Sequence, residues 1–261
     1  MRALNITLIQ SELHWEDIDA NLAMFTRKIE TVEPSTDLIV LPEMFTTGFS
    51  MQAEKLAQDM DGPAVQWLRR TAHRQKTAIV GSMIIHEDGF YYNRLLWAGP
   101  DEQLFTYDKK HLFRFAGEEK VYTPGTRLIT IELQGWKIRP FICYDLRFPA
   151  WSRNLDPYYD IALFIANWPE RRSVHWRTLL KARAIENQCY VVGLNRVGQD
   201  GLGISYSGDS AVIDSTGSVL FEKKHAAIIH TQPFSYQQLQ TNRQTFPAWM
   251  DADQDVINLP G

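Results

Sequence analysis

Short apolar runs, each ending at a polar residue, recur along the chain. The clearest are 37–45 (DLIVLPEMF), 139–146 (RPFICYDL) and 160–169 (DIALFIANWP). Continuous runs of Ile, Leu, Val, Phe and Ala are typical of strands that are buried on both faces. Further strands of this kind are predicted at 4–10, 77–85 and 189–195.

The stretches between these runs carry apolar residues at helical spacing. The pattern predicts helices over 19–32, 63–75 and 175–188. The second of them begins at a Gly-Pro pair, and proline is favoured in the first turn of a helix. Residues 210–222 are predicted to form a strand hairpin that turns around 215–218. Strands alternating with helices, followed by a hairpin, indicate a layered α/β fold.

The chain length and composition suit one large core. The chain has 261 residues, of which 44% are hydrophobic, and single α/β domains reach this size. No Gly-, Ser- or Pro-rich linker and no abrupt change of charge marks a boundary. We therefore expect a single domain over 1–261, with a core at about 4–235 and a C-terminal extension at about 236–261 that has no chemical motif.

Charge and hydropathy argue against a nucleic-acid or membrane partner. The net charge of −4 gives no electrostatic reason to expect nucleic acid or an anionic membrane. The apolar runs are far shorter than the ~20 residues that span a bilayer, and the first residues lack a signal-peptide pattern. Two cysteines that lie far apart are typical of a reducing compartment. We expect a cytoplasmic protein whose partner is a small molecule.

Three polar residues at predicted strand ends can form a reactive site. Glu43, Cys143 and Asn167 each close an apolar run, and ligand sites in α/β sheets gather at the carboxyl ends of strands. A cation supplied by 107–113 (YDKKHLF) is expected to lower the pKa of Cys143 and so favour the reactive thiolate. The same cation can stabilise the oxyanion that forms when a carbonyl is attacked.

A second oxyanion donor is expected next to the cysteine. The backbone N–H of Tyr144 can serve if the chain turns into a helix directly after Cys143, and residues 147–155 (RFPAWSRNL) are predicted to begin that helix. Asp145 and Arg147 are interpreted as a structural ion pair or a cap.

Taken together, these motifs resemble those of the nitrilase, or carbon–nitrogen hydrolase, superfamily. The resemblance rests on LPEMF, YDKKHLF, CYDLRFP and NWP in this order, with RAIENQCYVVGLNRVG and GDSAVIDSTG after them. It extends from the first strand to about residue 235. It implies an α-β-β-α sandwich of four layers, a hydrolase that needs no cofactor or metal, and a homodimer. The catalytic triad that it implies is Glu43, Lys109 and Cys143.

The family pattern also chooses between neighbouring residues. It places the lysine two residues before the histidine of HLF, which selects Lys109 over Lys110. It places a second glutamate seven residues before the glycine of a Pro-Gly turn, which selects Glu118 over Glu119. The role implied for Glu118 is to orient the lysine and to help position substrate and water.

Within the superfamily the chain is most similar to the ω-amidases. These enzymes hydrolyse the terminal amide of 2-oxo dicarboxylic acid monoamides such as 2-oxoglutaramate and 2-oxosuccinamate. The carboxylate of such a substrate needs a cation, and arginine can grip it with two hydrogen bonds. Arg171 and Arg172, in NWPERRSVHW, are the candidates. The other candidate substrate-binding residues are Phe113, Tyr144, Asn167 and Trp168.

Other interpretations of these residues stay open. A nitrile hydrolase uses the same triad and differs only in substrate, and an acyltransferase of the superfamily passes the acyl group to an amine. A non-catalytic binding protein can keep the fold, although it would be expected to have lost part of the triad. Cys143 alone could be a buried structural thiol, whereas Cys189, within an apolar strand, is assigned to the core.

Two further chemistries have weaker support. A Cys–His hydrolase would use His111 or His175, but no Asn or Asp stands out to orient either ring. A zinc site is not indicated, because the sequence contains no CxxC or HExxH pattern.

Overall fold

The computed structural model describes residues 2–155 and 157–253. Its strands are β1 (Leu4–Gln10), β2 (Leu38–Val40), β3 (Ala78–Glu87), β4 (Phe90–Ala98), β5 (Leu104–Asp108), β6 (Ile131–Leu133), β7 (Trp136–Ile142), β8 (Ile161–Ala166), β9 (Tyr190–Asn195), β10 (Val197–Gln199), β11 (Ser205–Ile213), β12 (Val219–Lys224) and β13 (Ile228–Phe234). Its α-helices are α1 (Ile18–Ile29), α2 (Ala53–Leu56), α3 (Pro63–Gln75), α4 (Ser173–Asn187) and α5 (Tyr236–Thr245). Short 3₁₀ helices are η1 (Arg114–Ala116), η2 (Glu118–Lys120), η3 (Cys143–Arg147), η4 (Glu170–Arg172) and η5 (Ala248–Asp251).

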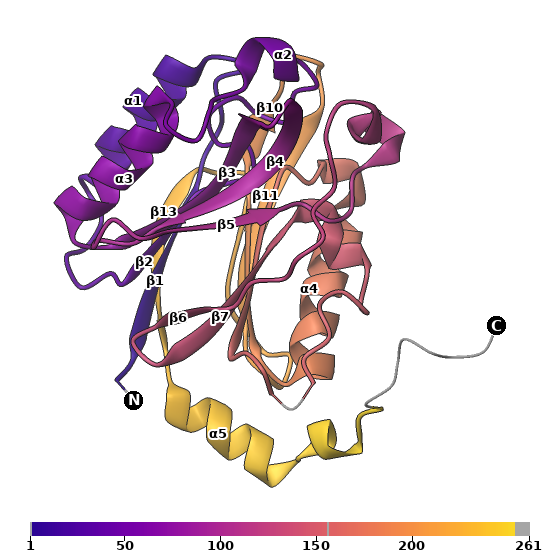
Figure 1. The fold of residues 1–261 in the computed structure, drawn as a ribbon. Coiled ribbons are helices and arrows are strands. Elements are labelled where there is room, and N and C mark those ends of the chain that lie inside the picture. The colour runs from indigo at the N-terminus through magenta and orange to yellow at the C-terminus, as the bar shows by residue number, and fades with distance from the viewer. Residues whose placement is uncertain (1, 156, 254–261) are drawn as a thin grey trace.

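The strands form two sheets that are packed between helices (Figure 1). The first sheet has the order β13-β1-β2-β3-β4-β5, and α1 and α3 cover its outer face. The second has the order β10-β11-β9-β8-β7-β6, with β12 paired to β11, and α4 covers it. This is the α-β-β-α sandwich that the family resemblance implied.

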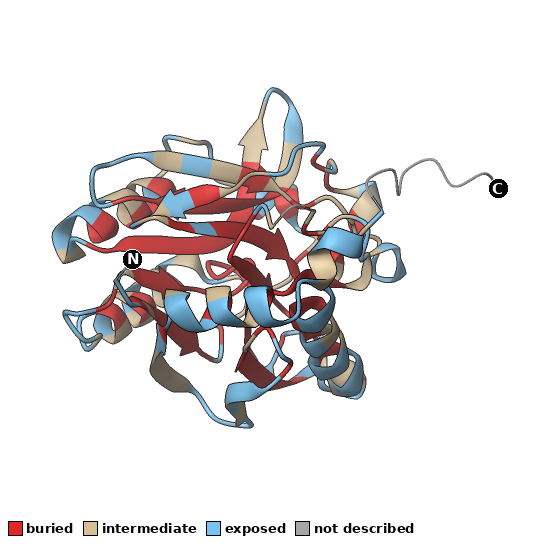
Figure 2. Ribbon diagram, turned by 90° about the horizontal axis from the view of Figure 1, so that it is seen from below, coloured by how far each residue is buried: buried red, intermediate tan, exposed pale blue. Residues whose placement is uncertain are grey.

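The main core lies between the sheets, and alternation along the strands explains how it is filled. Leu38 and Val40 belong to the cluster that joins the two sheets, whereas Ile39 packs under the outer helices. Successive side chains of a strand point to opposite faces, so a strand buried on both sides must be apolar at every position. Figure 2 shows the result, with buried strands inside and exposed residues on the outer surfaces of the helices.

The predicted elements match the structure closely where periodicity defines them. The strand at 4–10 and the helix at 63–75 have the predicted bounds. The hairpin of β11 and β12 turns at Asp214–Ser218. The helix expected at 147–155 is wrong: the chain forms the five-residue η3 instead and then continues through turns.

Three parallel strands deliver the polar residues to one edge. β7, β8 and β9 pair in parallel, so their carboxyl ends lie side by side. Cys143 follows β7 directly, and Asn167 follows β8 directly. The first sheet contributes Glu43, three residues beyond β2, and Lys109, the residue after β5.

The C-terminal extension packs on the body, with Leu239 in the main core and one buried arginine in an ion pair. Arg243, in α5, forms an ion pair of 2.9 Å with Asp160 and donates to the carbonyl oxygens of Tyr159 and Gln188. Residues 254–261 of the expected extension lie outside the described ranges. None of the helices in the described ranges combines the length and hydropathy of a membrane-spanning segment.

Candidate active site

A buried lysine between two carboxyl groups forms the centre of the site. The Lys109 Nζ atom lies 2.8 Å from Glu43 Oε1 and 2.9 Å from both carboxyl oxygens of Glu118. All three side chains are almost completely buried. Burial by itself lowers the pKa of Lys109, but Glu118 and Glu43 outweigh it, so the pKa is raised and the group stays an ammonium.

The Glu43 carboxyl group is held in a fixed orientation. Asn93 Nδ2 donates to Oε1 at 2.8 Å, and the backbone N–H of Asn167 donates to Oε2 at 2.8 Å. Asn167 Nδ2 also donates to the Glu43 carbonyl oxygen at 2.6 Å. Asn93 comes from the middle of β4, where no local motif marks it, and only the sheet brings it to this site.

Cys143 lies in a strained turn at the start of η3. Its φ is +45°, in the left-handed region that costs a residue with a Cβ about 1–2 kcal/mol. Cys143 is 8% exposed and lines a cavity that is described below. Such strain is typical of functional positions, and here it turns the chain sharply at the point where the strand delivers the sulfur.

The thiol is protonated at rest, and the predicted lowering of its pKa is wrong. Burial raises the pKa of Cys143 well above its ordinary value. The charge of Glu43 raises this pKa further, whereas the charge of Lys109 lowers it by less than these two effects together. The physical reason is that a thiolate would be buried here, and that the two carboxyl groups beside the Lys109 ammonium offset its attraction for a further negative charge. The charge of Glu43 acts on the thiol more strongly than any other charge, so Glu43 is placed to take the proton during attack rather than before it.

Asp145 fixes the relation between the two halves of the site. It is fully buried and accepts hydrogen bonds from the Ile142 N–H at 3.1 Å, the His111 N–H at 3.0 Å and the Tyr107 hydroxyl at 2.7 Å. Of the two structural roles considered for Asp145, an ion pair or a cap, the structure shows the cap. These bonds tie the cysteine turn to the segment that carries the lysine.

His111 has a carboxylate partner that the sequence did not indicate. Its Nδ1 atom lies 2.8 Å from Asp145 Oδ1, and its ring stacks on Phe148 with centroids 3.9 Å apart. The charge that acts most strongly on the Cys143 thiol is nevertheless that of Glu43. This favours Glu43 over His111 as the base for the thiol.

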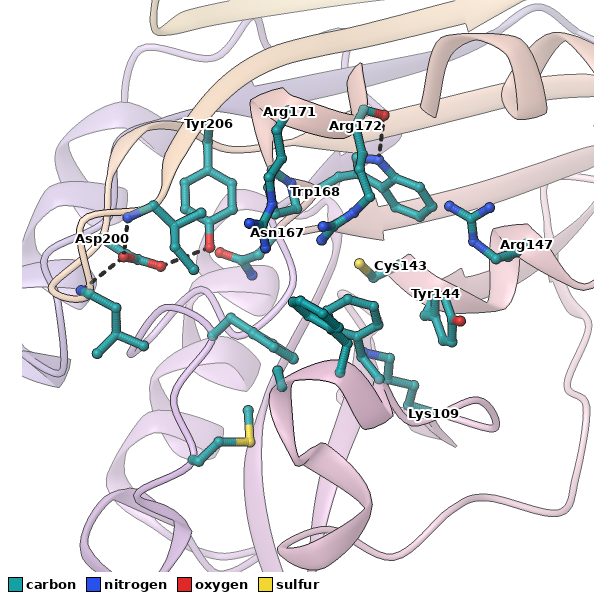
Figure 3. A pocket seen from close by; sticks show the side chains of 18 residues that line it. Lys109, Cys143, Tyr144, Arg147, Asn167, Trp168, Arg171, Arg172, Asp200 and Tyr206 are labelled. Atoms are coloured by element: carbon teal, nitrogen blue, oxygen red, sulfur yellow. Dashed lines mark hydrogen bonds between the residues drawn. The ribbon is translucent and has the colours of Figure 1, made fainter. Parts of the chain in front are cut away.

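The cysteine and the lysine open onto one cavity of about 250 Å³ (Figure 3). All six predicted substrate-binding residues lie in its wall: Phe113, Tyr144, Asn167, Trp168, Arg171 and Arg172. Glu43 and Glu118 lie outside the wall and contact Lys109 from inside the protein. The sequence analysis missed Arg147, Tyr206 and Asp200 as lining residues.

The cavity is strongly cationic on one side. Arg147, Arg171 and Arg172 line it, and within residues 2–155 and 157–253 no carboxylate lies within 4 Å of their guanidinium nitrogens. Burial lowers the pKa of Arg172, and the neighbouring charge of Arg171 lowers it further. The lining carboxylate, Asp200, already accepts from the Tyr206 hydroxyl at 2.9 Å. This side of the cavity is therefore suited to an anionic group.

No group of three or more His, Cys, Asp and Glu side chains is placed to hold a metal ion in the parts of the chain that the structure describes.

Known proteins are similar to the chain over nearly its whole length. Residues 5–231 match the family profile described as carbon–nitrogen hydrolase. The chain is 47% identical to "Omega-amidase YafV" of Escherichia coli (strain K12), over 97% of this chain and 98% of that protein. It is 33% identical to "2-oxoglutaramate amidase" of Bacillus subtilis (strain 168), over 96% and 98%.

One solved structure shares this fold. XC1258 from Xanthomonas campestris, described as a CN-hydrolase superfamily protein with an arsenic adduct in the active site, matches with a TM-score of 0.96. It is 43% identical, and the match covers 99% of this chain and 100% of that one.

Proposed function

The chain belongs to the carbon–nitrogen hydrolase family, and from this we propose that it is an ω-amidase. Its substrates are 2-oxo dicarboxylic acid monoamides, such as 2-oxoglutaramate and 2-oxosuccinamate, and its products are the 2-oxo acid and ammonia. The observation that carries the proposal is one cavity in which Cys143 and Lys109 face three arginines. The relatives named ω-amidase and 2-oxoglutaramate amidase support the same substrate class.

The first half of the reaction forms a thioester. Glu43 takes the proton of Cys143 while the sulfur attacks the amide carbon, and the charge that develops on the oxygen is stabilised by Lys109 and the backbone N–H of Tyr144. When the carbon–nitrogen bond breaks, Glu43 gives the proton to the departing nitrogen. Ammonia leaves, and the acyl group remains on the sulfur.

The second half releases the acid. Glu43 removes a proton from a water molecule, which attacks the thioester carbon, and the proton returns to the Cys143 sulfur as it leaves. Glu118 holds the Lys109 ammonium with both carboxyl oxygens at 2.9 Å, so the oxyanion donor is already in place when charge develops. Its part is to position Lys109.

Substrate preference tests the proposal directly. Ammonia release from 2-oxoglutaramate is expected to exceed that from an uncharged short-chain amide by at least about 10-fold in kcat/KM, because charge-assisted hydrogen bonds contribute about 1.5–3 kcal/mol. The panel includes a short-chain nitrile and an amine acceptor, which reveal a nitrile hydrolase or an acyltransferase. Equal rates on the charged and uncharged amides would contradict the ω-amidase assignment.

Loss of the buried ammonium is expected to slow the reaction strongly. Lys109→Ala should lower kcat by at least about 100-fold, since removal of one oxyanion donor costs this much in other enzymes. The matched control is Lys110→Ala, because Lys110 is the next residue and its Nζ lies over the ring of Trp151. Similar losses in both variants, measured as ammonia release, would argue against the role of Lys109.

The wider setting is proposed on the same basis. Residues 1–261 act as one carbon–nitrogen hydrolase domain, and the enzyme works as a homodimer in the cytoplasm without a nucleic-acid partner. Both cysteines are free thiols, which suits a reducing compartment. Sedimentation at about twice the 30.2 kDa mass of the chain is the measurement that tests the dimer.

A further inference from the structure

The three arginines of the cavity differ in how firmly they are held. Arg171 is exposed and lies over the ring of Phe115, which is itself 78% exposed. Arg172 is half-buried and lies over the ring of Phe113, with 5.1 Å to its centroid. Arg147 is half-buried and packs between two rings, at 5.8 Å from Tyr144 and 5.5 Å from Trp168. Arg171 therefore lies at the exposed rim of the cavity, while Arg147 is restrained within the cavity wall.

A histidine restrains Arg147 further without neutralising it. Arg147 Nη2 lies 3.1 Å from Nδ1 of His175, which is in the first turn of α4. Guanidinium nitrogens only donate, so the imidazole accepts with a neutral nitrogen. The contact orients the arginine and leaves its positive charge uncompensated.

The nearest carboxylate in sequence is engaged elsewhere. Asp145 uses one oxygen for the Tyr107 hydroxyl and the other for His111. In the described part of the chain, the contact with His175 is the one hydrogen bond that the Arg147 side chain makes. A guanidinium group has five N–H donors, so an edge remains that can grip a carboxylate with two parallel bonds.

The short helix η3 carries both the nucleophile and this charge. Cys143 is its first residue and Arg147 its last. Because one short helix bears both groups, and because two rings and His175 restrain the Arg147 side chain, the cation is already placed relative to the attacking sulfur before substrate binds.

We infer that Arg147, oriented by His175, binds the substrate carboxylate together with Arg172 and determines the preference for anionic amides. The inference rests on the proposed function. It assigns binding of the substrate carboxylate to a residue outside the Arg-Arg pair of the NWPERR loop. Arg171 attracts anions from the rim and makes no essential contact. Preorganisation favours this assignment, because a side chain that is already ordered loses little entropy on binding.

The test compares two arginines in the same cavity. Arg147→Gln is expected to lower kcat/KM for 2-oxoglutaramate by about 50-fold and to affect an uncharged short-chain amide far less, so that the ratio between the two substrates collapses. Arg171→Gln removes the same charge at the rim and should cost less than about 5-fold. Thermal melting of both variants shows whether the fold is retained.

A second readout does not depend on turnover. The product 2-oxoglutarate should protect Cys143 of the wild type and of Arg171→Gln from alkylation by iodoacetamide, and should protect Arg147→Gln at least 10-fold less well. His175→Ala should raise KM for 2-oxoglutaramate with little change in kcat, because it loosens a binding contact. His175→Gln keeps an acceptor and should restore KM.

The outcomes separate this inference from the function on which it rests. If the wild type prefers the 2-oxo acid but Arg147→Gln loses both substrates equally, or keeps product protection, the inference fails and the ω-amidase assignment stands. If the wild type shows no preference for the anionic amide, both fail. The inference is supported if the ratio between the two substrates collapses in Arg147→Gln but not in Arg171→Gln, and if His175→Gln restores the KM that His175→Ala raises.

Discussion

Cys143→Ala is expected to abolish ammonia release from 2-oxoglutaramate, lowering kcat at least about 10,000-fold. No other thiol lines the described part of the cavity. Without the nucleophile, only substrate binding and oxyanion stabilisation still accelerate the reaction, and their contribution to the rate is small. The substitution removes one sulfur from the cavity wall, so the fold should persist. Ammonia release and thermal melting of the purified variant are the measurements.

The second cysteine provides a matched control. Cys189 is fully buried in the core, and burial raises its pKa to about 12. Cys189→Ala should keep most of the activity while lowering stability slightly, because it leaves a small cavity. Turnover that survives in Cys143→Ala, or that is lost equally in both variants, would remove the thioester mechanism.

Glu43→Gln is expected to lower kcat by at least about 1,000-fold and, at the same time, to lower the pKa of the Cys143 thiol. Activity falls because the group that accepts and returns protons in both halves of the reaction is gone. The pKa falls because burial and the Glu43 charge both raise it in the wild type, and the substitution removes the second cause. The variant should therefore contain more thiolate and yet turn over less substrate.

The thiolate can be measured by its ultraviolet absorbance. Cys143→Ala supplies the background spectrum for the wild type, and the double variant of Cys143→Ala with Glu43→Gln supplies that for Glu43→Gln. Each background is subtracted at every pH of the titration. More thiolate in Glu43→Gln than in the wild type at the same pH is the expected result. A thiol pKa that stays the same or rises would mean that Glu43 does not face the sulfur, and retained activity would mean that it is not the base.

Local sequence patterns were sufficient for most of the layers of the fold. Strand 4–10 and helix 63–75 have the predicted bounds, because an element packed against a core must repeat its apolar residues at its own period. β4 and β5 were not predicted. The polar and exposed residues at the start of β4 weaken the apolar signal there.

The site was only partly accessible to sequence reasoning. Motifs identified Glu43, Lys109 and Cys143 as candidates, and the structure places the first two 2.8 Å apart, where the charges of both act on the thiol. Asn93 and Arg147 had no recognised signal as site residues. Their parts arise from contacts between segments far apart in the chain, and a single sequence carries no direct record of such contacts.

The sequence by itself determined the layered fold, the family and the residue types that can do the chemistry, because periodicity and short motifs are local properties. Only the tertiary structure decided the protonation of Cys143 and the partners of its neighbours. A pKa depends on burial and on every charge within a few ångströms. Here the carboxyl groups of Glu43 and Glu118, from different segments, both form ion pairs with the Lys109 ammonium. The same holds for Arg147, whose partner became His175 because Asp145 is engaged on the other side of the turn.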